Sequence, residues 1–134
     1  MANALYGKGR ERFLKGEIDW LNDTFKVSLL SSAYTVAIDT HEFYSDLTGE
    51  VAVETFPLLS RTATLGVADG QNVTFSTVSG STVESIVIWK YNSLGAGSSP
   101  LVAYIDDATN LPITPNGGDI TVAWDSGAFR IFKL

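Results

Sequence analysis

The feature that most constrains the fold is a series of short runs rich in β-branched and aromatic residues, separated by turn-forming residues. The runs are residues 25–30, 34–38, 51–56, 61–65, 72–78, 83–91, 101–105, 119–124 and 129–134. Between them lie pairs such as Asp69-Gly70 and Ser79-Gly80, which tolerate the positive φ angles of tight turns. This spacing predicts an all-β domain of mainly antiparallel sheets, either a β-sandwich or a small barrel.

Two of the runs also predict their positions in the sheets. Residues 86–89 are apolar throughout, which predicts a central strand covered on both faces. Residues 120–124 alternate between larger apolar residues and Thr or Ala, which predicts a strand with one buried face. Because a turn sequence at 125–127 follows, we expect this strand to form a C-terminal hairpin with residues 129–134.

The N-terminal segment is the exception to the β pattern. Residues 3–15 predict one short helix that places Tyr6 and Phe13 on one face and stops at Gly16. Gly7 and Gly9 each cost about 1 kcal/mol of helix propensity relative to Ala, so the helix needs tertiary support. We therefore divide the chain into an N-terminal helical arm, residues 1–16, and a single β-sandwich domain, residues 17–134. The length of 134 residues suits one domain.

A second interruption of the β pattern falls at residues 40–47. Thr40 is placed to cap a short helix or turn in which Phe43 and Leu47 face inward.

Composition bears on the possible partners. The net charge of −6 disfavours general binding to nucleic acids, because like charges repel at long range. No apolar run approaches the ~18 residues that a membrane span requires, and charges interrupt the first fifteen residues where a signal peptide would be apolar. We therefore expect a protein made in the cytoplasm that binds neither nucleic acid nor membrane.

The residues that catalysis would require are sparse. His41 is the single histidine, and Ser45 stands where a zinc-protease motif beginning at His41-Glu42 would need its second histidine. The chain has no cysteine, which excludes thiolate nucleophiles and Cys-ligated metals. We expect His41 to be a loop or capping imidazole bonded to a neighbouring backbone group. The chain is thus predicted to be no enzyme and to hold no cofactor.

Acidic residues at predicted strand ends and turns could pair as a glycosidase site, but short acids at such places usually cap backbone N–H groups. They are Glu17, Asp19, Asp106, Asp107, Asp119 and Asp125. Asp106, Asp107 and Asn110 could also supply oxygen ligands to Ca²⁺, although they lack the spacing of an EF-hand.

The sharpest polar feature is the concentration of basic residues near the start. Lys8, Arg10, Arg12 and Lys15 are four of the nine basic residues. One interpretation is a solvated helix face on which Glu11 and Lys15 pair at i and i+4. The other is an arm that docks on an acidic surface of a partner.

Over nearly its whole length the chain resembles a family of small virion structural proteins of tailed bacteriophages. The resemblance rests on Ala4-Leu5-Tyr6, Gly9-Arg10, Gly16-Glu17-Ile18-Asp19-Trp20, residues 40–46, Gly66-Val67-Ala68-Asp69, Val73-Thr74-Phe75, Ala103-Tyr104-Ile105-Asp106, residues 111–120 and Arg130-Ile131-Phe132-Lys133-Leu134. It implies a non-catalytic component of the virus particle.

Within the particle, the resemblance leaves two places open. The first is a capsid decoration (cement) protein that binds the outside of the major capsid protein lattice as a homo-oligomer, for example a trimer. In that case we expect Tyr6, Arg10, Arg12 and Phe13 to form the contact with the capsid, unless the helix packs on its own domain. The alternative is a tail, neck or fibre component that binds glycans through exposed aromatics such as Trp20 or Trp89.

Overall fold

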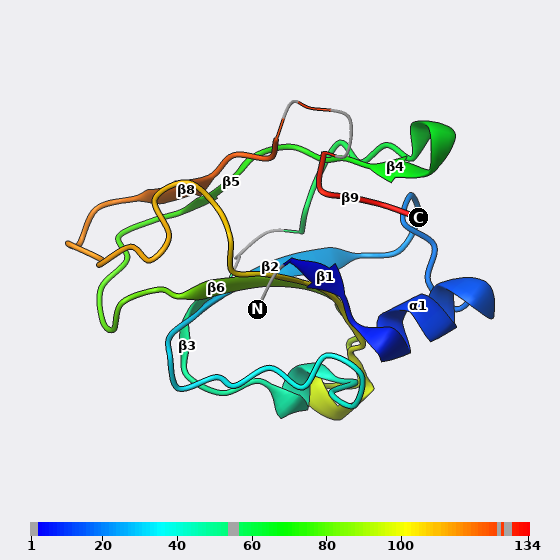
Figure 1. The fold of residues 1–134 in the computed structure, drawn as a ribbon, viewed down its shortest axis with the longest axis horizontal. Coiled ribbons are helices and arrows are strands. Elements are labelled where there is room, and N and C mark those ends of the chain that lie inside the picture. The colour runs from blue at the N-terminus through cyan, green and yellow to red at the C-terminus, as the bar shows by residue number, and fades with distance from the viewer. Residues whose placement is uncertain (1–2, 54–56, 126, 128–129) are drawn as a thin grey trace.

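The computed structural model describes residues 3–53, 57–125, 127 and 130–134, and it shows a mainly β chain with one short α-helix (Figure 1). The predicted all-β class is therefore confirmed. The strands are β1 (Ala4–Leu5), β2 (Phe25–Leu30), β3 (Glu50–Val53), β4 (Val67–Ala68), β5 (Val73–Phe75), β6 (Ser85–Lys90), β7 (Leu101–Ile105), β8 (Ile120–Val122) and β9 (Phe132–Lys133). The helix is α1 (Gly7–Leu14), and three 3₁₀ turns are η1 (Tyr44–Asp46), η2 (Thr64–Gly66) and η3 (Ala96–Ser98).

The main sheet has five antiparallel strands in the order β1-β7-β6-β2-β3. Its middle strand, β6, sends Ile86 and Ile88 into one hydrophobic cluster and Val87 and Trp89 into another. Successive side chains of a strand point to opposite faces, so both faces of β6 are covered. The prediction of a central strand at residues 86–89 is confirmed.

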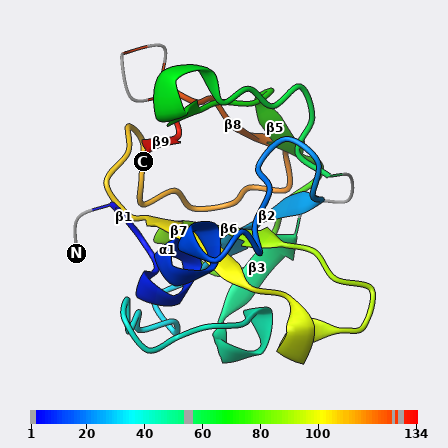
Figure 2. The ribbon, with the colours of Figure 1, turned by 90° about the vertical axis from the view of Figure 1, so that its right-hand side faces the viewer.

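Two short ribbons, β5–β8 and β4–β9, lie over one face of the main sheet and form a second layer (Figures 1 and 2). Between the layers lies the larger core, to which Phe25, Val27 and Leu29 of β2 contribute together with Val73 and Phe75 of β5. All five side chains are at most 4% exposed. Each layer thus buries the apolar face of the other, as a β-sandwich requires.

The opposite face of the main sheet is covered by irregular chain instead of strands. Tyr34 belongs to the second cluster on this face. The residues that pack against this cluster are Val36, Ile38, Tyr44 and Leu47. The prediction of a strand at 34–38 is wrong, because these residues form loops and turns. Their apolar side chains lie on the sheet without joining its hydrogen-bond ladder.

The N-terminal segment is part of the domain and not a separate arm. Residues 4–5 pair with β7 in the main sheet, and the helix begins only at Gly7. Tyr6 precedes the helix and lies in the second cluster, whereas Phe13 packs against the first, so the two residues do not share one face.

The predicted helix stop at Gly16 is confirmed. Gly16 has φ +73° and donates its N–H to the Phe13 carbonyl at 3.2 Å, while the Glu17 N–H reaches the Arg12 carbonyl at 2.9 Å. This is a Schellman motif, which satisfies carbonyl groups at the end of the helix.

Two further strand predictions need correction. Residues 61–65 contain only an isolated bridge from Thr62 to Asp69, because Leu65 and then Gly66 adopt positive φ and end the extended run in η2. The C-terminal hairpin is also wrong, since β8 pairs with β5 and β9 pairs with β4. Residues 54–56 of the predicted strand 51–56 lie outside the described residues. The same is true of residue 129 of the predicted strand 129–134.

The prediction of a short helix or turn at 40–47 is confirmed by one 3₁₀ turn, η1, but Thr40 does not cap it, because the turn begins only after Phe43. The cap comes from Asp46, whose Oδ2 accepts the N–H groups of Glu42 and Phe43 at 2.8 and 3.0 Å. These backbone hydrogen bonds hold the pKa of Asp46 below its usual value.

Candidate functional site

The four residues predicted to contact a partner do not form one surface. Tyr6 is fully buried, and its hydroxyl lies 2.8 Å from that of Tyr34. Phe13 packs edge-on against Phe132 with ring centroids 5.9 Å apart. For these aromatics, the alternative expectation of a helix packed on its own domain is confirmed.

The two arginines of that set differ in their surroundings. The side chain of Arg12 is 22% exposed and pairs with Glu42 at 2.7 Å and with Glu17 at 3.4 Å. Arg10 is exposed, donates to the Leu5 carbonyl at 2.9 Å and lies 3.7 Å from Asp39. The predicted pair of Glu11 and Lys15 is present at 2.9 Å. The basic face of α1 is therefore largely engaged in contacts within the chain.

His41 belongs to a chain of hydrogen bonds that starts in the core. Its Nδ1 lies 2.8 Å from the Tyr34 hydroxyl and accepts the Ala37 N–H at 3.4 Å. The expectation of a loop imidazole bonded to a backbone group is thus confirmed. Burial raises the pKa of Tyr34 to about 12, and burial with the hydrogen bond to Tyr34 raises the pKa of Tyr6 as well. Both hydroxyls are therefore neutral at ordinary pH.

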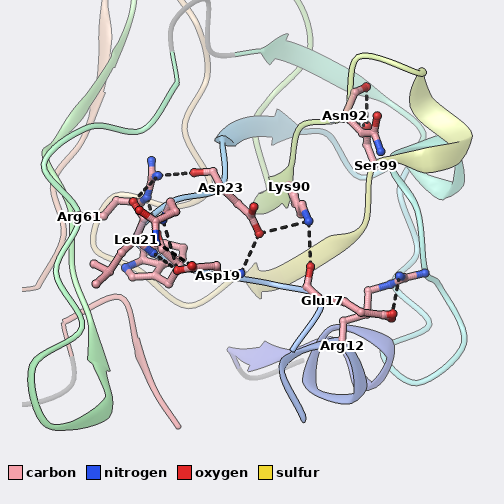
Figure 3. Close-up of polar contacts among 11 residues, drawn as sticks. Arg12, Glu17, Asp19, Leu21, Asp23, Arg61, Lys90, Asn92 and Ser99 are labelled. Carbon is pink, nitrogen blue, oxygen red and sulfur yellow. Dashed lines mark hydrogen bonds and ion pairs between the residues drawn. The ribbon is translucent and has the colours of Figure 1, made fainter. Parts of the chain in front are cut away.

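The loop before β2 is fixed by two cations, which contact it from other elements (Figure 3). Lys90 of β6 donates to the Glu17 carbonyl at 2.8 Å and pairs with Asp23 at 3.1 Å. Arg61 donates to the carbonyls of Trp20 at 2.6 Å and Leu21 at 3.2 Å, and also to those of Leu58 and Asp23. A guanidinium with four carbonyl partners serves to hold the chain together.

Three of the six predicted acidic candidates cap backbone N–H groups. Asp19 accepts from Leu21 and Asn22, Asp119 accepts from Thr77, and Asp125 accepts from Gly127. The Asn22 side-chain amide is the main reason that the pKa of Asp19 is lowered. These contacts are those of turn residues, as the sequence predicted.

Neither predicted glycan-binding tryptophan lies on the surface. Trp20 is 6% exposed and donates its indole N–H to the Thr62 carbonyl at 3.0 Å, and Trp89 is 4% exposed and donates to the Ser28 hydroxyl at 2.9 Å. The expectation of exposed aromatics at these positions is wrong, because both rings fill the core. Sequence alone missed this because Trp is common both in cores and at binding surfaces.

A cleft of about 890 Å³ lies between the main sheet and β8. Leu29, Ile86 and Ile105 form its floor on the main sheet, and Leu111 and Ile113 line it from the segment after β7. Its polar rim consists of Asn3, Asp107, Asn110, Asp119, Asp125 and Arg130. A volume of this size with an apolar floor is typical of binding sites.

The cleft follows the edge of β8. All seven residues from 119 to 125 line it, although successive side chains of a strand point to opposite faces. A cavity in contact with every one of them must therefore run along the strand edge. A smaller groove of about 380 Å³ runs in the same way along β5, where residues 71–76 face Ala52 and Val53 of β3. The two-stranded ribbon thus has a hollow beside each edge.

Two residues of the calcium prediction, Asp106 and Asp107, contact the N-terminal segment through their backbone N–H groups. The Asn3 side-chain oxygen accepts the N–H groups of Asp106 and Asp107, each at 2.9 Å, which ties the N-terminus to the end of β7. In the part of the chain that the structure describes, no group of three acidic, His or Cys side chains could hold a metal ion. Nor does any helix among the described residues have the length and apolar character to cross a membrane.

Comparison with protein-family models and with curated proteins found no match to this chain.

Proposed function

We propose that this chain is a non-enzymatic structural protein that acts by binding other proteins, and that it decorates the capsid of a tailed bacteriophage. The observation that carries the binding role is the cleft beside β8, where an apolar floor lies next to a strand edge. Such edges readily pair with another chain.

The non-enzymatic role is supported by the state of the polar residues. The single histidine is bonded to Tyr34 and Ala37, and Asp19, Asp46 and Asp119 cap backbone N–H groups. An acid or base in catalysis must be able to reach a substrate proton. These side chains are already engaged in the structure of the domain.

The placement on the capsid is supported by the sequence resemblance to virion proteins, and it names the major capsid protein and further copies of this chain as partners. Exposed leucines suit contact with a lattice: Leu14, Leu65 and Leu94 are each at least 84% exposed. A tail, neck or fibre component remains the second candidate. Trp20 and Trp89 are buried, so they do not support glycan binding by such a component.

The test is an electron-microscopy reconstruction of the parent particle, with the copy number of this chain measured by quantitative mass spectrometry. Decoration predicts density that repeats over the outer capsid surface and a copy number comparable with that of the capsid lattice. Density confined to the tail axis at low copy number would instead establish the second candidate. Absence of the chain from purified particles would contradict both.

A further inference from the structure

The hydrogen-bond pattern around β8 shows which of its backbone groups face the cleft. The Trp124 N–H reaches the Asn72 side-chain oxygen at 3.2 Å. This contact lies on the side of β5. Because backbone groups alternate in direction along a strand, even-numbered residues of β8 face β5 and odd-numbered residues face away.

Thr121 and Ala123 therefore direct their N–H and C=O groups toward the cleft. The ladder agrees with this assignment, because Thr74 and Thr121 lie opposite each other with their hydroxyl oxygens 3.1 Å apart, as suits a non-hydrogen-bonded pair. Among the described residues, β8 pairs with β5 alone, and both Thr121 and Ala123 are exposed. The edge offers two donors and two acceptors in the register of a strand.

The cleft also provides a surface for side chains. A strand added beside β8 would place every second side chain over the floor formed by Leu29, Ile86 and Ile105. Side chains that fit this floor are apolar, since burying a polar group there without a partner is costly. An occupant of this edge should therefore alternate apolar and polar residues.

The charges on the rim indicate the ends of the occupant. Asp107, Asp119 and Asp125 line the cleft, and Arg130, the one basic residue of the lining, lies 4.0 Å from Asp69. The rim is acidic, so a segment flanked by Lys or Arg is favoured.

A second copy of this chain fits the edge poorly. In the antiparallel register that pairs Thr121 of one copy with Ala123 of the other, Asp119 of each copy would lie opposite Asp125 of its partner. Like charges directly opposite each other destabilise a pair of strands. This repulsion, together with the acidic rim, favours a basic segment of another polypeptide as the occupant.

We propose that the free edge of β8 binds an extended segment of a partner protein by β-strand addition, and that this segment has apolar residues at alternate positions and a basic residue at each end. Only the location of that partner, in the virus particle, rests on the proposed function. Binding itself follows from the edge, the apolar floor and the acidic rim.

The test uses the full chain and a synthetic peptide, Lys-Val-Thr-Ile-Thr-Val-Lys, blocked at both ends. We expect saturable binding by calorimetry, and slower amide hydrogen exchange at Thr121 and Ala123 when the peptide is bound. A peptide with Glu at both ends should bind about tenfold more weakly. A peptide with the same side chains but N-methylated at alternate amides should lose binding, because it cannot form the ladder.

Two variants of the protein locate the site. Ala123→Pro removes an N–H from the open edge without touching the ladder to β5, and it should abolish binding while β6 keeps its exchange protection. Asp107→Lys should weaken binding about fivefold. Its matched control is Asp39→Lys, which makes the same change of charge beside Ile38, on the other face of the main sheet. This variant should leave the affinity for the peptide unchanged.

Several outcomes would overturn the proposal. They are no saturable binding of the lysine peptide, equal binding of the N-methylated peptide, and slowed exchange at β8 caused by self-association without peptide. Because these measurements need no virus particle, their failure is distinguishable from failure of the capsid assignment. If Ala123→Pro does not fold, Asp107→Lys and the N-methylated peptide still decide the question.

Discussion

At the scale of single residues, hydroxyl groups connect the second core to its covering loop. The Tyr34 hydroxyl lies 2.8 Å from both the Tyr6 hydroxyl and His41 Nδ1. Tyr6 is fully buried, so its hydroxyl has no access to water if Tyr34 is changed. The loop at 31–49 is thus joined to the sheet by specific polar contacts in addition to apolar packing.

We expect Tyr34→Phe to destabilise the protein by about 1–3 kcal/mol, because it leaves the buried Tyr6 hydroxyl without its partner. Urea unfolding would measure this change. The matched control is Tyr91→Phe, at a ring that is 43% exposed, with an expected effect of about 0.5 kcal/mol or less. Adding Tyr6→Phe to Tyr34→Phe removes the unmatched group, so the double variant should cost less than the sum of the single ones. Additive effects would contradict the pairing.

The same tyrosines predict sensitivity to alkali. Burial raises the pKa of Tyr34 to about 12, above its ordinary value of 10.0, so the folded state keeps a proton that the unfolded state releases. The contribution of the neutral tyrosine hydroxyls to the free energy of unfolding is complete below pH 10 and is lost as pH rises toward 12. We expect the urea midpoint to fall over this range, together with a late appearance of tyrosinate absorbance. A midpoint that stays constant between pH 10 and 12 would contradict the structure.

At the scale of elements, the helix depends on a glycine that helix propensity disfavours. Gly9 is buried where α1 crosses the start of β7, and a Cβ there would lie 2.8 Å from the Leu101 carbonyl oxygen and 3.2 Å from that of Val102. The absence of a side chain is what lets the helix approach the sheet. Sequence identified the cost of this glycine, and the packing gives its reason.

Gly9→Ala should therefore destabilise the protein, by about 1–2 kcal/mol, even though Ala is the better helix former by about 1 kcal/mol. The clash is with backbone atoms, which cannot move aside as the end of a flexible side chain can. The control is Lys8→Ala at the neighbouring, partly exposed position, expected to change stability by at most about 0.5 kcal/mol. Thermal and urea unfolding would both measure the difference. A stabilised Gly9→Ala variant would show that α1 does not pack closely on β7.

At the scale of the whole molecule, the N-terminus closes the domain. β1 pairs with β7, the Tyr6 N–H reaches the Val102 carbonyl at 3.0 Å, and the Gly7 N–H reaches the Ile38 carbonyl at 2.8 Å. Residues 4–7 therefore contact the main sheet and the loop that covers its second face. They belong to the folding unit.

Deletion of residues 1–16 should accordingly abolish cooperative unfolding, because it removes the buried Tyr6 ring and one edge of the sheet. Circular dichroism during urea unfolding would detect this. Leu14→Ser, at a side chain that is 90% exposed, serves as a control for loss of apolar surface without loss of the fold. A truncated chain that still unfolds cooperatively would restore the expectation of a separable docking arm.

Three features could be predicted from local sequence: the all-β class, the central strand at 86–89 and the helix stop at Gly16. Each follows from local chemistry: alternation or continuity of apolar residues sets how many faces of a strand are buried, and a glycine can take the positive φ that ends a helix. The backbone contacts of His41 and of the capping acidic residues could also be predicted, because short polar side chains bond to nearby backbone groups.

The pairing of the strands and the surfaces that remain open depend on the three-dimensional arrangement of the chain and could not be predicted. β8 pairs with β5 instead of β9, since pairing depends on contacts between residues distant in sequence, such as Val73 and Val122. Burial of Tyr6 and Trp20 was likewise undetermined, because an aromatic side chain suits a core and an interface equally well. The edge of β8 is open because, among the described residues, β8 pairs with β5 alone, and no local pattern in the sequence records which strand edge lacks a partner.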